Sequence, residues 1–158
     1  MRSLILTTLL TLLTFTTPTL AFEGKGQLRT RWYEGDHADL GCLTETGRWT
    51  GNEEKCGVFV AVPAENHQFN LSSPAGDCYV SGATFQCDDG EEAFQFGEWP
   101  ASWPNGIPGT PVLRWGQYGL MASNERNAPG VADTPQAVHL ISYNEPGKRI
   151  WLTWKGLE

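Results

Sequence analysis

The three histidines are the side chains best suited to move protons near neutral pH. They lie in the triplets Asp36-His37-Ala38, Asn66-His67-Gln68 and Val138-His139-Leu140. A small guanyl-type ribonuclease would need a Glu, an Arg and a His converging on phosphate, and Glu98, Arg114 and His139 could supply these types. Nothing in their spacing brings them together. The chain also lacks the Gly-x-Ser-x-Gly elbow of many serine hydrolases, so we predict no catalytic residues.

Carboxylates are densest at 88–92, where Asp88-Asp89-Gly90-Glu91-Glu92 offers oxygen ligands of the type that calcium prefers. The alternating spacing of an EF-hand loop is absent. Asp89-Gly90 lies between strand-like residues on both sides, which is typical of a hairpin turn. The segment therefore predicts a turn, and we expect neither a metal nor a cofactor.

The first residues have the order of a secretory signal. Arg2 supplies a positive start, residues 4–13 are apolar apart from threonines, and Thr19-Leu20-Ala21 is a small-residue cleavage site. The apolar run is far shorter than the ~20 residues of a membrane span. We expect a signal peptide at 1–21 and an exported, soluble domain at 22–158.

Without Arg2 the formal net charge changes from −7 to −8. Binding to nucleic-acid phosphates needs clustered Lys and Arg, and this chain has no basic run. We therefore expect neither nucleic acid nor a membrane among its partners.

Four cysteines in an exported chain predict two disulfides, for which three connectivities exist. A zinc site is disfavoured because there is no Cys-x-x-Cys pair and no histidine lies near a cysteine. We expect the two sequence-local pairs, Cys42–Cys56 and Cys78–Cys87.

Strand patterns dominate the rest of the chain. Leu28, Thr30 and Trp32 alternate with Arg29, Arg31 and Tyr33, the period of a half-buried strand. Similar runs occur at 57–62, 68–71, 78–81, 84–87, 93–96, 112–115, 137–143 and 150–154, separated by turn residues. They predict an all-β fold, a small antiparallel barrel or sandwich. The stretch 100–135 is rich in proline and tryptophan and predicts a long loop or edge strand.

Trp99 and Trp103 stand in a proline-stiffened loop within a chain of seven tryptophans. Exposed, rigid tryptophans suit stacking on sugars or anchoring a protein partner, so both are candidate ligand-binding residues. The alternative is that they cover one edge of the core. Asn70-Leu71-Ser72 is a candidate glycosylation site.

Several segments resemble the C-terminal accessory domain of fungal ribonuclease T2-like proteins. GKGQL at 24–28 and GCL at 41–43 look like its first two strands, and the cysteine bracket 76–87, preceded by FNLSS at 69–73, is the most specific piece. LTWKGL at 152–157 is similar to the terminal strand of that domain. The resemblance implies a non-catalytic β domain, and the histidine motifs of the ribonuclease catalytic domain have no counterpart. Here the domain directly follows a signal peptide, and 104–136 is longer than the family needs.

These observations predict a secreted, non-catalytic binding module for cell-wall carbohydrate or a protein surface. The alternative is a small secreted hydrolase or toxin-like ribonuclease whose site has no recognised motif.

Overall fold

The computed structural model describes residues 21–90, 93–104, 106–116, 119–122, 134–141 and 149–158. The predicted signal peptide therefore lies almost entirely outside the described residues. The described part is all-β, with two short 3-10 turns, η1 (Glu53–Lys55) and η2 (Glu65–His67). Its strands are β1 (Gly24–Trp32), β2 (Asp39–Leu43), β3 (Trp49–Thr50), β4 (Phe59–Pro63), β5 (Gln68–Ser73), β6 (Gly76–Ser81), β7 (Thr84–Asp88), β8 (Gln95–Trp99), β9 (Val112–Arg114), β10 (Gly119–Ala122), β11 (Val138–Ile141) and β12 (Arg149–Gly156).

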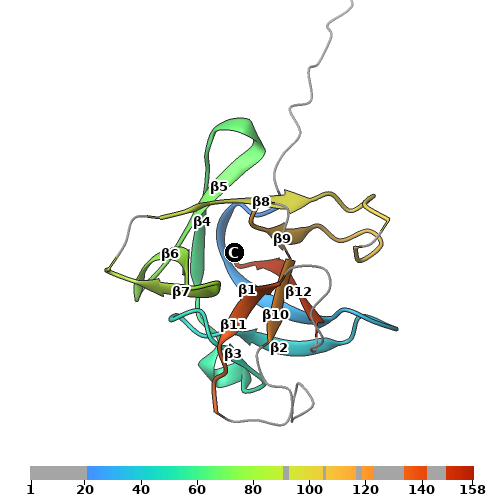
Figure 1. Ribbon diagram of the computed structural model, residues 1–158, viewed down its shortest axis with the longest axis horizontal. Coiled ribbons are helices and arrows are strands. Elements are labelled where there is room, and N and C mark those ends of the chain that lie inside the picture. The colour runs from blue at the N-terminus through green and yellow to red at the C-terminus, as the bar shows by residue number, and fades with distance from the viewer. Residues whose placement is uncertain (1–20, 91–92, 105, 117–118, 123–133, 142–148) are drawn as a thin grey trace, which may run out of the picture.

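The strands form an antiparallel barrel, as the sequence predicts (Figure 1). Starting from β1, hydrogen-bonded neighbours run through β12, β10, β11, β7, β6, β5 and β4, and β4 pairs with β1 again. The pairing of β1 with β12 is the longest and extends from Gly26↔Gly156 to Trp32↔Ile150. First and last strands thus lie side by side.

Two long strands carry additional pairs. One edge of β1 pairs with two strands in succession: the start of β1 pairs with β4, and its later residues pair with β2, where the register shifts after Thr30. One edge of β5 likewise pairs with β8 at Gln68–Asn70 and with β6 at Ser72–Ser73. The pairs β2–β3 and β8–β9 therefore extend from the barrel, and both lead into the candidate sites.

The predicted hairpin at Asp89-Gly90 is wrong. A turn does occur there, but β7 pairs with β6 and β11, while β8 pairs with β5 and β9. The hairpin of this region is β6–β7, which turns at Gly82 and Ala83. Both have positive φ, 53° and 62°, the backbone of a type I′ turn that suits the twist of paired strands.

The core is filled by aromatic and aliphatic side chains from most of the strands. Phe22, just before β1, is fully buried and stacks on Phe69 with ring centroids 5.0 Å apart. Phe85 and Phe96 meet edge to face at 5.5 Å. These contacts connect segments that are not hydrogen-bonded neighbours in the sheet.

Arg29 departs from the predicted alternation on β1, because its side chain is buried although it points away from Leu28 and Thr30. The guanidinium bonds Asp39 of β2 at 2.8 Å and Glu53 of η1 at 2.6 Å. A buried cation needs such partners. A charged contact thus covers the outer face of β1.

Both disulfides are the predicted ones. Cys42–Cys56 joins β2 to the residue after η1, and Cys78–Cys87 joins directly opposed residues of β6 and β7. Among the described residues no helix has the length and apolar character needed to cross a membrane.

Acid should weaken the contact between Arg29 and its carboxylates. Burial raises the pKa of Asp39, but hydrogen bonds from Arg29 and the Gly41 N–H outweigh it, so this pKa lies below its ordinary value. The hydrogen bond from Arg29 lowers the pKa of Glu53. A group whose pKa is lower in the folded state stabilises the folded protein when the pH is above its pKa in the unfolded state, which is about 4 for these carboxyls. This stabilisation is lost as the pH falls through the pKa of the folded state.

We therefore expect the urea midpoint to fall as the pH decreases below about 4, and to fall less in Arg29→Met. Urea titrations of both proteins at several pH values measure this. An equal loss in the two proteins would show that other carboxylates control acid stability.

Candidate functional site

The two tryptophans predicted to bind ligand lie at the end of β8 and in the turn that follows it. Trp99 and Trp103 stack on each other with centroids 4.0 Å apart and ring planes 18° apart. Both side chains are half-buried. Because two rings at this distance leave no room between them, the faces that meet are closed to a ligand.

The stack rests against Trp151 of β12. Trp151 is nearly perpendicular to both rings, with centroid distances of 5.7 Å to Trp99 and 5.8 Å to Trp103. These equal distances place Trp151 beside the stack. Tyr33 lies 5.2 Å from Trp151 on another side, and the Arg149 guanidinium lies over the Tyr33 ring. The stack therefore packs on Trp151, which alternates along β12 with the core residues Ile150 and Leu152. The role of the two tryptophans in binding stays a prediction.

The histidines have separate partners. His37 Nδ1 lies 3.0 Å from the carbonyl oxygen of Trp32, and His67 is exposed in η2. His139 Nδ1 lies 2.9 Å from Thr84 Oγ1, across the β7–β11 pair. No two histidines are brought to one site.

Glu98, Arg114 and His139 do not converge either. Glu98 faces the backbone of Ala21, while Arg114 donates to the carbonyl oxygens of Glu98 and Gly116. His139 is on β11 with Thr84. Nor does the described part of the chain hold a group of three or more His, Cys, Asp or Glu side chains placed to bind a metal ion.

Asn70, the candidate glycosylation site, lies within β5, between Val62 of β4 and Gln95 of β8. It is half-buried, and its Oδ1 is buried without a hydrogen-bond partner among the described residues. Its glycosylation stays a prediction.

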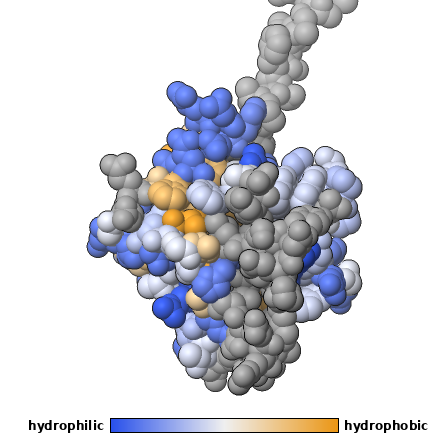
Figure 2. All heavy atoms as spheres, viewed as in Figure 1, coloured by the Kyte–Doolittle hydropathy of each residue, from blue (hydrophilic) through white to orange (hydrophobic). Residues whose placement is uncertain are grey.

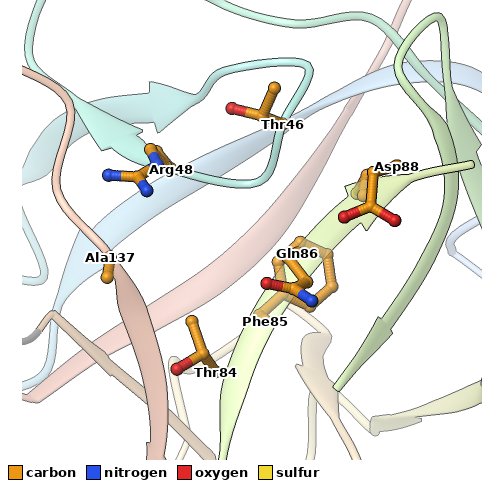
Figure 3. A pocket seen from close by; sticks show the side chains of 8 residues that line it. Thr46, Arg48, Thr84, Phe85, Gln86, Asp88 and Ala137 are labelled. Atoms are coloured by element: carbon orange, nitrogen blue, oxygen red, sulfur yellow. The ribbon is translucent and has the colours of Figure 1, made fainter. Parts of the chain in front are cut away.

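A polar pocket that the sequence did not single out lies on the outer face of β7 (Figure 3). It has a volume of about 250 Å³, and its walls come from the β2–β3 turn, β7 and the residue before β11. The lining side chains that can form hydrogen bonds are Thr46, Arg48, Thr84, Gln86 and Asp88. Phe85 and Cys87 alternate with them and point into the core.

Close backbone approaches form the walls of the pocket. Gly47 has a φ of +81°, and a Cβ there would lie 2.9 Å from the Phe85 ring, so only glycine lets this turn lie against β7. On the other side, Trp49 and Gln136 exchange two backbone hydrogen bonds of 2.8 Å. This bridge places Ala137 beside the turn.

Tyr79 of β6 orients two side chains of the pocket. Its hydroxyl donates to Asp88 Oδ1 at 2.8 Å and accepts from Gln86 Nε2 at 2.8 Å. Asp88 Oδ1 also accepts from the Gly90 N–H. The Gln86 carbonyl oxygen and the exposed Arg48 guanidinium have no partner among the described residues. The pocket thus combines fixed and open hydrogen-bonding groups.

Such a set suits a neutral, hydroxyl-rich ligand. Amide, carboxylate, guanidinium and hydroxyl groups together donate and accept hydrogen bonds at defined positions. The volume of the pocket is below the range of roughly 300–1,000 Å³ for sites that hold drug-sized ligands. The pocket could therefore hold one ring of a larger ligand. The sequence signal for this site was the alternation of Thr84, Gln86 and Asp88 along β7.

Comparison with known families gives a match over about half of the chain. The model of the family described as the RNase T2-like C-terminal domain matches residues 20–101, which are 82 of the 158 residues. The match includes both cysteine pairs but ends before β9, so the similarity predicted at 152–157 lies outside it. No curated protein and no solved structure matched the chain.

The tryptophan stack should give an exciton couplet in the far-ultraviolet circular dichroism spectrum, because two indoles are in van der Waals contact. Trp99→Phe and Trp103→Phe should each weaken the couplet, because only the near-perpendicular pair with Trp151 remains, and each should cost about 0.5–1.5 kcal/mol of aromatic pairing. Spectra and urea titrations of the single variants check this, with Trp32→Phe as a control. A couplet of undiminished intensity in both variants would contradict the stacked arrangement.

Proposed function

The chain belongs to the family of RNase T2-like C-terminal domains, and we propose that it is an exported, non-catalytic module that binds a neutral polysaccharide through the polar pocket on β7. The observation that carries the proposal is the set of hydrogen-bonding side chains that line that pocket from two segments, the β2–β3 turn and β7. Sugars need both donors and acceptors, and this pocket offers both. The domain of residues 22–158 would be the functional unit.

The surface favours a carbohydrate over a protein partner. Stable protein interfaces usually have an apolar centre. Among the described residues the large apolar side chains that are exposed are Val62 and Leu157, which are single positions. Figure 2 shows one face of the molecule, where the coloured residues are mainly hydrophilic apart from a small hydrophobic patch.

Charge favours a neutral ligand over RNA or an acidic polysaccharide. The net charge of −7 repels polyanions. Arg48 is one cation, and it lies across the same pocket from the carboxylate of Asp88 (Figure 3). Its guanidinium is better placed to bond hydroxyl groups than to offset the charge of a chain of phosphates.

Export is supported by the two disulfides, which persist in oxidising compartments. The order of charge, apolar run and small residues at 1–21 supports it independently.

One contact favours the alternative of a small secreted hydrolase. Thr84 Oγ1 and His139 Nδ1 are 2.9 Å apart at the edge of the pocket, within the distance of a nucleophile and its base. In the described residues no carboxylate contacts His139 to orient it, and both residues are opposed in a strand pair. A cross-strand hydrogen bond explains the contact without catalysis.

The binding proposal predicts that Arg48→Ala and Gln86→Ala each weaken retention on insoluble neutral polysaccharide by about tenfold, the effect of losing one charged or well-placed hydrogen bond. Pull-down isotherms on chitin and on β-1,3-glucan measure this, with polygalacturonate as an acidic comparison. Lys25→Ala is the matched control, because Lys25 is exposed and lies outside the pocket.

If both pocket variants were retained as well as the wild type and Trp99→Ala were not, the polysaccharide would bind at the tryptophan stack and not in the pocket. Retention on polygalacturonate alone would refute the neutral ligand.

The non-catalytic proposal predicts that His139→Gln leaves retention unchanged within about twofold. Neither it nor the wild-type protein should release soluble sugars or cleave RNA. Reducing-sugar and RNA-cleavage assays measure this. Release by the wild type that is abolished in both His139→Gln and Thr84→Val would establish the hydrolase instead.

A further inference from the structure

The chain enters the barrel at Ala21-Phe22, the bond at which the sequence predicts removal of the leader. Phe22 is fully buried, stacked on Phe69 at 5.0 Å and tilted against Trp154 at 5.6 Å. Ala21, one residue earlier, is exposed. The predicted cleavage position therefore coincides with the boundary between solvent and core.

A carboxylate lies at this boundary. The Ala21 N–H donates to Glu98 Oε2 at 3.0 Å, and the N–H groups of Ala21 and Phe22 both act on the Glu98 carboxylate. The side chain is half-buried at the end of β8. Burial raises the pKa of Glu98 more than these two N–H groups lower it. In the unprocessed chain, the two N–H groups therefore do not offset the cost of burying the charged carboxylate.

Among the described residues, the other ionisable groups around Glu98 do not offset the cost of burying its charge. The paired strand β5 contains none, and Arg114 of the paired strand β9 directs its guanidinium to the carbonyl oxygens of Glu98 and Gly116. Glu23, next to Phe22, is exposed and of like charge. A positive charge on the first residue of the mature chain would offset the cost of burying the Glu98 carboxylate.

We propose that Glu98 is the docking site for the α-ammonium group that cleavage after Ala21 creates on Phe22. Hydrolysis of this bond consumes one water, leaves a carboxylate on Ala21 and frees the Phe22 amine, which takes a proton at neutral pH. Because Phe22 is buried in the folded barrel, cleavage precedes folding. The pairing rests on the export part of the proposed function and is independent of polysaccharide binding.

The pair has a defined pH window. An α-amino group has an ordinary pKa of about 7.7–8.0, and a carboxylate neighbour raises it. A group with a raised folded pKa stabilises fully below its unfolded pKa and loses that contribution as pH rises through the folded value. The carboxylate must also be ionised, so the contribution declines in acid as Glu98 takes up a proton. The stabilisation should therefore be largest near neutral pH.

Two forms with defined first residues test the pairing. One begins at Phe22 and the other at Thr19, which keeps the Ala21 N–H but moves the ammonium three residues away. The Phe22 form should melt roughly 2–5 °C higher at pH 7, and the difference should shrink at pH 4 and pH 10. In Glu98→Gln the two forms should melt alike, whereas in the control Glu23→Gln the difference should persist.

A second measurement does not depend on the stability of variants. Titration of the Phe22 α-amine by nitrogen NMR in the folded protein should give a pKa above the ordinary ~7.7–8.0. An ordinary value, or an equal advantage of the Phe22 form with Glu98→Gln, would overturn the proposal. Sequencing of exported protein that began elsewhere than Phe22 would overturn it as well, while a failure to bind polysaccharide would leave it intact.

Discussion

The buried guanidinium of Arg29 determines how β2 and η1 are arranged against the barrel. A cation with 9% of its side chain exposed needs carboxylates, and it takes one from β2 and one from η1. These contacts fix both segments against β1, and the Cys42–Cys56 bond fixes them to each other. The β2–β3 turn that carries Gly47 and one wall of the pocket is held in place from this side.

The local features of the fold follow from the sequence. Alternating apolar residues identified most of the strands, and short separation favoured the correct cysteine pairs. The pairing of the strands was harder to predict from the sequence. Asp89-Gly90 has the composition of a hairpin turn, but β8 pairs with β5 and not with β7. Turn residues report the local backbone conformation, but the choice of partner depends on which long-range contacts bury the Phe85 and Phe96 rings.

The candidate site was less predictable for the same reason. Polar alternation on β7 was visible in Thr84, Gln86 and Asp88, but the pocket also needs Arg48 from a distant turn and the bridge between Trp49 and Gln136. The tryptophan loop was recognised by composition, yet its partner Trp151 comes from the last strand. Contacts between segments far apart in sequence give no local pattern.

The pairing of β1 with β12 has a consequence for the order of folding. Residues 149–156 form β12, the last of the described strands, and lie outside the segment matched to the family. During synthesis one edge of β1 therefore stays without its β12 partner until residues 150–156 have been made. Such non-local pairing slows folding, and open strand edges promote aggregation. The β6–β7 hairpin is closed by the Cys78–Cys87 bond within ten residues. It can therefore form before β12 pairs with β1.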